Sequence, residues 1–486
     1  MKKTITALSS VCFVAVSAFG YTSNEIDWKS NAADGNLASA DNWSNVPSGV
    51  TDISYDMTAD EGYWGKFMIG SKTLNLYISS PFAFDRLYFQ GSNSKYNIDL
   101  GGNTLTLRGA ATYEFTTNEN YPNQKIVVKN GNIAFSKSTR REFRIQGSGN
   151  VMTVAGTEEA PVTISGGTFI PTVLKGGELV FSNTVFASGA KKVQVNSSGS
   201  KMSFVGPKTS VSCSSSEFLG VGTTASSNTM VIAEGANVAA SFIRVGVSGV
   251  SNRMDVASSG KLVSSADAPS DSGLEIGGAG SAGTVFNVDG GTVALTNTLF
   301  AMRGSSAGSR TLARIANGAD VCAQFVSVTN DGNRIEIDNA ALTVRTRGVF
   351  PQAGDNSVEL KFSGSHPLLA YEDVSHSSVA KAFSFAEGAS LEFVVPSGGY
   401  VEAPIKSANG ITVAGLSSAT IDAAAFLAAG GQEQVLMDAG AGTISIDAAS
   451  MEVLKTAGGG VLNAKLADGG KRLVLSRTKG FVLIFR

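Results

Sequence analysis

Charged residues, proline, cysteine and histidine are all scarce in this chain of 486 residues. Charged residues make up 16% of it, whereas ordinary soluble domains carry about 25%. Only 11 prolines occur and 43% of the residues are hydrophobic, which excludes collagen, coiled coil and intrinsic disorder. The net charge of −2 offers no basic field for nucleic acid, so we expect no nucleic-acid partner.

Cysteine and histidine are too few to suggest a disulfide framework or a metal centre. Beyond Cys12, the chain has only Cys213 and Cys322, with no Cys-x-x-Cys pair, and we expect both to be small buried hydrophobes. The two histidines, His366 and His376, lack the tight spacing of zinc ligands. A solvated loop is the favoured interpretation there, and we predict no metal site, no cofactor and no catalytic residue.

Long hydrophobic runs are also missing, apart from a short one at the N-terminus. Lys2 and Lys3 precede an apolar stretch from Ile5 to Val16, which is too short to span a bilayer. We interpret residues 1–20 as a signal peptide cleaved after Ala18 or Gly20, a retained anchor helix being the alternative. The sequence therefore predicts a secreted or cell-surface protein without a transmembrane segment after cleavage.

Glycine is abundant, with 56 residues, and it punctuates an internal repeat. Residues 230–238, 313–321 and 383–391 share the template apolar-x-apolar-Ala-polar-Gly-Ala-x-apolar, and looser copies begin at Met254, Phe286, Ile335 and Val358. Successive copies start 22 to 32 residues apart. Apolar side chains alternate with polar ones inside each copy, which indicates strands, and glycine suits a turn with positive φ.

One such repeat cannot fold alone, because five or six buried side chains at about 1.5–3 kcal/mol each do not offset about 1–2 kcal/mol of backbone entropy per residue. Stacked repeats share a core, so we predict an all-β fold, a parallel β-helix (β-solenoid). An array of antiparallel sandwiches is the alternative. We expect Met230, Met254, Ala313 and Phe383 to lie along one interior column.

The same stacking separates the two later cysteines. Cys213 and Cys322 are 109 residues, or some four coils, apart. A coil rises by about 4.8 Å, which puts them roughly 19 Å apart along the axis. A disulfide requires Cα atoms within about 7 Å, so we predict two free thiols.

The two ends of the chain differ from the repeats at 98–415. Residues 21–97 form an aromatic-rich N-terminal cap region, in which nine aromatic residues fall between 61 and 96. Stacked core aromatics are favoured there over a sugar-stacking face. Residues 416–486 predict a small mixed α/β C-terminal cap, because Ile-Asp-Ala-Ala occurs at 421–424 and again at 446–449. We expect two short helices, strands at 434–437 and 473–476, and a last strand or docking edge at 480–486.

Two features resemble secreted, autotransporter-passenger-like β-helix proteins with autotransporter-associated β-strand repeats. One is the N-terminal pattern of Trp28, Asn42-Trp43, Pro47 and Asp52; the other is the coil Ile98-Asp-Leu-Gly-Gly-Asn-Thr-Leu-Thr-Leu107. The resemblance covers about residues 24–415, and no segment of this sequence resembles the translocator barrel of such proteins. It implies adhesion, surface display or matrix roles, with extracellular glycans or matrix components as partners.

Three motifs suggest chemistry but are better explained by the repeats. Residues 304–308 spell the Gly-x-Ser-x-Gly of a nucleophile elbow, and 278–283 spell Gly-x-Gly-x-x-Gly. Both motifs need a following helix, whereas the residues that follow them here have strand alternation. Glu158 and Glu159 are a poor acid–base pair, because neighbours in a strand point to opposite faces.

The one local basic run could hold an anionic ligand. Together with two aromatic residues it defines a candidate ligand surface of Tyr63, Trp64, Lys137, Arg140, Arg141 and Arg144. A solvated strand is the favoured alternative. The leading hypothesis is a non-catalytic, adhesin-like or matrix scaffold, and the runner-up is a carbohydrate-active lyase or hydrolase. Three or more carboxylates converging on one exposed sheet would favour the enzyme.

Overall fold

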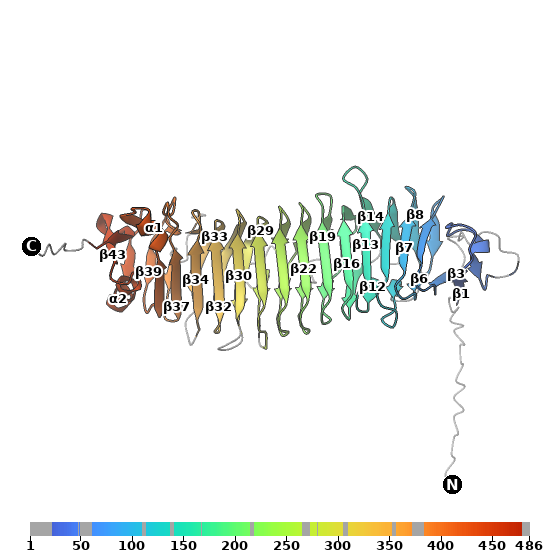
Figure 1. The fold of residues 1–486 in the computed structure, drawn as a ribbon, viewed down its shortest axis with the longest axis horizontal. Helices are drawn as coiled ribbons and strands as arrows, with labels where there is room; N and C mark the ends of the chain where they lie inside the picture. The colour runs from blue at the N-terminus through green and yellow to red at the C-terminus, as the bar shows by residue number, and fades with distance from the viewer. Residues whose placement is uncertain are drawn as a thin grey trace, which may run out of the picture.

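The structure is a computed structural model that describes residues 22–46, 48, 61–108, 113–136, 140–166, 168–213, 218–264, 273–278, 280–304, 310–351, 356–371 and 383–478. Figure 1 shows these residues as a row of coils stacked along one long axis, with the N-terminal coils at one end and two short helices at the other. Each coil visits three faces in turn, which we call face 1, face 2 and face 3; face 1 is a sheet of its own, whereas long strands that continue from face 2 to face 3 join these two into one 30-stranded sheet. The chain is thus a parallel β-solenoid, as the repeats predict.

Face 1 is a sheet of 14 parallel strands. Its strands are β4 (Thr73–Tyr77), β7 (Lys95–Asp99), β10 (Lys125–Lys129), β13 (Val151–Ala155), β16 (Glu178–Ser182), β19 (Lys201–Val205), β22 (Thr229–Ala233), β25 (Arg253–Ala257), β28 (Val285–Asp289), β30 (Thr311–Ala316), β32 (Asn333–Asp338), β34 (Val358–Ser363), β37 (Ala389–Val394) and β40 (Ser418–Asp422).

Most face 2 strands follow the preceding face 1 strand after a tight turn, and the last two follow longer connections. Its strands are β5 (Phe82–Phe84), β8 (Thr104–Leu107), β11 (Asn132–Phe135), β14 (Val162–Ser165), β17 (Thr184–Phe186), β20 (Ser210–Ser212), β23 (Asn237–Ala240), β26 (Lys261–Ser264), the first halves of β29 (Thr292–Arg303), β31 (Asp320–Thr329) and β33 (Ala341–Phe350), then β35 (Leu368–Tyr371), β38 (Ile405–Ser407) and β41 (Glu433–Asp438).

Face 3 completes the coil. Its strands are β1 (Thr22–Trp28), β3 (Glu61–Phe67), β6 (Arg86–Phe89), β9 (Tyr113–Thr117), β12 (Arg140–Gln146), β15 (Thr168–Leu174), β18 (Val193–Val195), β21 (Phe218–Val221), β24 (Phe242–Val245), β27 (Gly273–Ile276), the second halves of β29, β31 and β33, then β36 (Phe383–Phe385), β39 (Ile411–Val413) and β42 (Ile444–Ile446). The short 3₁₀ helix η1 (Ala40–Asn42) leads into β2 (Trp43–Ser44), which pairs antiparallel with β1.

The repeat template marks the turn between face 1 and face 2. In two copies the polar residue and the glycine after it both have positive φ: 54° and 81° at Glu234 and Gly235, and 56° and 77° at Asn317 and Gly318. Two such residues in succession make a tight corner that costs little when the second is glycine. This corner explains the polar-Gly step in these two copies.

The interior column exists, but one of its predicted members is elsewhere. Met230 pairs with Met254, Met254 with Phe286, and Phe286 with Ala313, and all four are fully buried on face 1. The prediction is wrong for Phe383, which lies on face 3 beside Gly348 and Ile411. The template is a strand–turn–strand unit, and the copy at Phe383 occupies the corner between faces 3 and 1 instead.

The aromatic residues of the first coils are mostly core. Trp43 lies 4.9 Å from Trp28 and 5.3 Å from Phe67, measured between ring centroids. Phe67 stacks on Phe89 at 5.0 Å, and Phe89 contacts Tyr96 at 4.8 Å. All five rings are at most 5% exposed, so these positions close one end of the hydrophobic interior.

The C-terminal cap contains the two expected helices, α1 (Ala424–Ala428) and α2 (Ala448–Ala457). Asp447 caps α2 by accepting a hydrogen bond of 2.7 Å from the backbone N–H of Ser450. The expected strands correspond to β41 and β44 (Arg472–Arg477). β44 follows the short 3₁₀ helix η2 (Asp468–Gly470) and pairs antiparallel with β41 and with β43 (Leu462–Ala467). The predicted last strand at 480–486 lies outside the described residues.

The two cysteines form no disulfide, as predicted. Both lie on face 2, and four strand-to-strand steps separate β20, just before Cys213, from β31, which contains Cys322. Cys213 is buried, and burial raises the pKa of its thiol to about 12. Cys322 points outward and is partly exposed, so the expectation of burial is wrong for this residue.

Candidate functional sites on the outer faces

Tyr63 and Trp64 are neighbours in β3 and therefore lie on opposite sides of face 3. Tyr63 packs against the hydrophobic core. Trp64 faces outward with its side chain partly exposed. Of the two predicted aromatic residues, only Trp64 therefore contributes to an outer surface.

Trp64 is the centre of an aromatic and cationic patch that we call the Trp64 patch. The Arg86 guanidinium carbon lies 4.6 Å from the Trp64 ring centroid, and Lys66 Nζ lies 5.3 Å from it. Tyr88 lies 6.0 Å away, ring centroid to ring centroid. Trp64 pairs with Arg86, and Lys66 with Tyr88, in the register of β3 and β6. Cations over an indole face contribute about 0.5–1 kcal/mol at exposed sites.

The predicted basic run begins three strands further along the same face. Arg144 in β12 is in register with Thr116, which is in register with Tyr88. Three strand steps put Arg144 about 14 Å from the strand that contains Trp64. Arg144 lies 3.3 Å from the carboxylate of Glu142, whose side chain is 1% exposed. Its charge is therefore compensated within its own strand.

For the other predicted basic residues, the structure describes at most the backbone. Arg140 and Arg141 lie in β12 in register with Thr168 and Phe169 of β15. Their side chains, and the whole of Lys137, lie outside the described residues. The structure thus brings Trp64 and Arg144 to one face, turns Tyr63 toward the core, and leaves Lys137, Arg140 and Arg141 a prediction.

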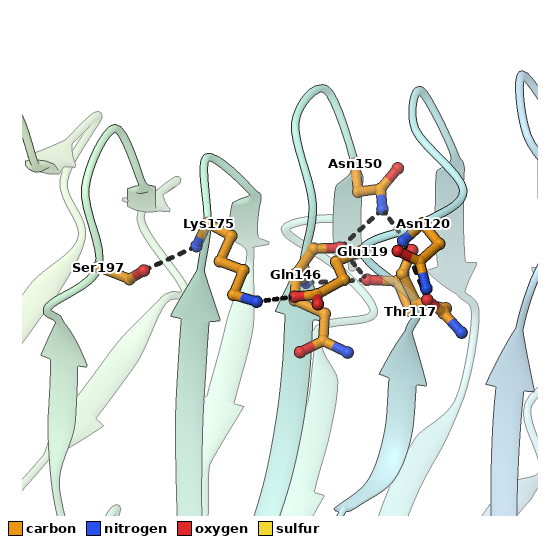
Figure 2. Close-up of polar contacts among 8 residues, drawn as sticks. Thr117, Glu119, Asn120, Gln146, Asn150, Lys175 and Ser197 are labelled. Atoms are coloured by element: carbon orange, nitrogen blue, oxygen red, sulfur yellow. Dashed lines mark hydrogen bonds and ion pairs between the residues drawn. The ribbon is translucent and has the colours of Figure 1, made fainter.

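Polar side chains lock the corner between face 3 and face 1 next to this surface. Thr117 Oγ1 donates a hydrogen bond of 2.9 Å to the carbonyl oxygen of Gln146 and accepts one of 2.8 Å from its N–H. Asn150 Nδ2 donates to the same carbonyl at 2.7 Å. Figure 2 shows Lys175 extending past Gln146 to pair with Glu119, two coils away. These contacts hold neighbouring turns in register and expose little unpaired charge.

Within the described residues, three carboxylates converge on the outer side of face 1. Arg334 in β32 contacts the carboxylates of Glu336, Glu359 and Glu392, at 2.7 Å for Glu336 and 3.1 Å for Glu392. Lys361 contacts Glu392 at 2.9 Å. We call these five residues the Arg334 cluster. It satisfies the condition that favours an enzyme, namely three carboxylates on one exposed sheet.

The Arg334 cluster borders a shallow hollow that is open to solvent. The hollow is lined by residues of β32, β34, β37 and β40 and of the turns before β30 and these strands, including Arg310, Asn333, Ser357, Ser390 and Ser418. Burial works against the charge of Arg334, but hydrogen bonds from its guanidinium to Glu359 and Glu336, and the charges of these carboxylates, outweigh it and raise the pKa of Arg334. The cation therefore stays charged, and each carboxylate faces a permanent positive charge.

The remaining motifs lead to strands or loops. The residues after Gly304 and Gly278 continue into β30 and β28, where a nucleophile elbow or a dinucleotide site would need a helix. Residues 305–309 and His376 lie outside the described part of the chain, whereas His366 is exposed and contacts Ser365. Glu158 and Glu159 are exposed in the turn between β13 and β14, not in a strand as expected.

The sequence analysis did not select several residues of the Trp64 patch and the Arg334 cluster. The repeat nevertheless indicates which residues of successive coils are in register. Trp64 and Arg86 are 22 residues apart, one coil length, and so are in register. Likewise Glu336 pairs with Lys361, which pairs with Glu392. Counting along the repeat, rather than along local runs of charge, would place each set on one face.

Within the described residues, no group of three His, Cys, Asp or Glu side chains is arranged to hold a metal ion. No helix in that part of the chain combines the length and apolar character needed to cross a membrane. No protein-family model, curated protein or solved structure matches the chain. Function must therefore be argued from the outer faces themselves.

Proposed function

We propose that this protein is an exported, non-catalytic β-helix rod that serves in adhesion, surface display or an extracellular matrix. One observation carries the proposal: charges that meet on the outer faces compensate one another within or between coils. Examples are Lys201 with Glu178 at 2.9 Å, and Arg244 and Arg303, which both lie 3.3 Å from Glu275. Such pairs add little to stability individually, but they leave few carboxylates in position for proton transfer.

Export is the part of the proposal that rests on sequence alone. Lys2, Lys3 and the apolar stretch that follows support it. Pulse-labelling in the native cell, followed by fractionation and N-terminal sequencing, tests it directly. We expect a mature chain beginning near residue 19 or 21 in the extracellular or surface fraction, and a full-length chain in the cytosol would contradict it.

The experiment that tests the binding role combines a glycan array with degradation assays on the same purified protein. We expect binding to extracellular glycans without release of reducing ends or unsaturated products. The Trp64 patch supplies the design: Trp64→Ala should weaken glycan binding, while Trp43→Phe, at a buried position on the same end, should leave it unchanged. Degradation of any polysaccharide would refute the non-catalytic role.

A carbohydrate-active enzyme is a second candidate, favoured by the convergence of Glu336, Glu359 and Glu392. A glycosidase needs one carboxylic acid that keeps its proton and one carboxylate, whereas all three here lie against Arg334 or Lys361. Polysaccharide cleavage that is lost in Glu359→Gln, but kept in Glu178→Gln on the same face, would establish this candidate. Equal activity in both variants would exclude the Arg334 cluster as its site.

A further inference from the structure

Face 2 differs from the other two faces because its outward side chains are small and almost uncharged. From β5 to β35, these positions in the described strands contain only two exposed charged residues, Lys261 and Asp320; Arg345, where β33 turns toward face 3, is partly buried. The others are Ala83, Thr104, Thr106, Asn132, Ala134, Thr163, Ser165, Val185, Ser210, Ser212, Asn237, Ala239, Val263, Thr292, Ala294, Cys322, Ala341, Thr343, Leu368 and Ala370. Side chains of this size allow another flat surface to approach closely.

The two charges are placed symmetrically about one strand. Lys261 is in register with Thr292, and Thr292 is in register with Asp320. Each charged residue is therefore one strand step, about 4.8 Å, from Thr292, in the same column and on opposite sides. Both side chains are exposed, and neither forms an ion pair with the described part of the chain.

We propose that face 2 binds face 2 of a second copy of this chain, with the two rods antiparallel. The two-fold axis lies in the interface and runs parallel to β29. Rotation about it makes the rod of the second copy run in the opposite direction, while each residue keeps its position along its strand. It therefore places Lys261 of each copy opposite Asp320 of the other and makes two ion pairs. A two-fold axis along the rod would instead place Lys261 opposite Val263, so the charges select the antiparallel arrangement.

The size of the contact sets the expected strength. With the axis at β29, the small-residue strands overlap from β20 to β35, which is seven strands or six steps. Six steps of about 4.8 Å and a strand width of about 13 Å give roughly 370 Å² per partner. The rods also overlap at β14, β17, β38 and β41, where Lys406, Glu433 and Asp438 lie at outward positions. Stable interfaces bury about 800 Å² per partner, so we expect a weak dimer with a dissociation constant of about 10–100 μM. This inference stands whether or not the proposed function is right.

A charge-reversal cycle tests the arrangement by sedimentation velocity of the full chain between about 1 and 100 μM. We expect Lys261→Asp and Asp320→Lys each to weaken dimerisation by at least about tenfold, because like charges then face each other. The double variant should restore it. Lys125→Asp, an exposed position on face 1 with the same change in net charge, is the matched control and should dimerise like the unaltered protein.

Cross-linking at the axis gives an independent readout. In a background of Cys12→Ser and Cys322→Ser, Thr292→Cys should be joined to its copy by a short bis-maleimide, and Thr104→Cys should not. A monomer at all concentrations, failure of the double variant to regain dimers, or cross-linking at Thr104 instead would overturn the proposal. So would face 2 variants that change only the binding of a polysaccharide, because the occupant would then not be a second copy.

Discussion

Replacing Phe181 with alanine tests how stability is transmitted along the rod. Phe181 in β16 is fully buried, stacks on Phe204 at 5.5 Å between ring centroids, and contacts Phe186 at 4.9 Å. Removing a buried phenylalanine costs about 3–5 kcal/mol. Because a solenoid coil contacts only its neighbours, the loss should appear as easier local opening of a few coils.

Hydrogen–deuterium exchange measures that opening strand by strand. An energy of 3–5 kcal/mol corresponds to exchange about 10²- to 10³·⁵-fold faster, at about 1.4 kcal/mol per tenfold. We expect the increase in β16 and equally in β13 and β19, because Val154 and Phe204 flank Phe181 in register. Strands from β28 onward should be unaffected.

The matched control is Val180→Ala, one residue away on the outer side of the same strand. It should change exchange by less than about tenfold, because it removes no core volume. Equal effects of the two variants would refute the inward–outward assignment. Faster exchange confined to β16 and its sequence neighbours β15 and β17 would refute the stacking of β13 and β19 on it.

Three further outcomes follow from individual contacts. Asn252→Ala leaves two buried donors of Asn228 without their acceptor, so local opening of β22 should become easier by about 1–3 kcal/mol in the same exchange experiment. Hydrogen bonds from the backbone N–H groups of Ser450 and Gly415 lower the pKa of Asp447 from its ordinary value of 3.8. Ionised Asp447 therefore stabilises the folded cap above pH 3.8, and this contribution is lost as the pH falls through the lowered pKa. Between pH 5 and pH 2, the thermal stability of Asp447→Asn should fall less than that of the unaltered chain. Cys322 should react with a maleimide in the native protein and Cys213 should not, as peptide mapping by mass spectrometry will show.

Each of these outcomes has a clear contrary result. Unchanged exchange in Asn252→Ala would mean that the buried amide pair is not needed for register. A parallel pH profile for Asp447→Asn would exclude Asp447 as the titrating cap. Native labelling at Cys213 at the rate of Cys322 would contradict the burial of the former.

The fold was accessible from the sequence because its determinants are local and repeated. A strand and a turn with positive φ recur in every copy of the template, and Asn317 with Gly318 shows the backbone reason for the polar-Gly step. The cap of α2 was equally readable, since the Asp447 side chain hydrogen-bonds within its first turn, whereas α1 has Ala423 at its N-cap and not the expected aspartate.

The outer clusters were harder to predict because they depend on register between coils of unequal length. Arg334 and Glu392 are 58 residues apart, and their contact depends on the exact number of residues in the two coils between them. Unequal coil lengths also explain why Phe383 was wrongly placed in the interior column of face 1. In its coil the template lies at the corner between face 3 and face 1. Local alternation shows which side a residue faces, but turn lengths decide which residues it meets.

Buried polar side chains at the corners were also missed, and glycine provides a partial signal for them. A Cβ at Gly222, which has φ 60°, would come within 2.0 Å of the Asn252 side chain. This glycine is therefore needed both for its backbone conformation and for the amide packed against it. Asparagine and glycine one coil apart at a turn thus indicate such a buried amide.

The most direct test of the stacked coils is a set of spin-label distances along one outward column of face 1. Asn97 leads through successive register pairs to Val231 after five steps, Arg314 after eight and Thr420 after twelve. With Cys12→Ser, Cys213→Ala and Cys322→Ser as background, double electron–electron resonance from Asn97→Cys to cysteines at these positions should give about 24, 38 and 58 Å, a linear rise of about 4.8 Å per coil. Distances that do not increase with the number of coils would contradict the solenoid.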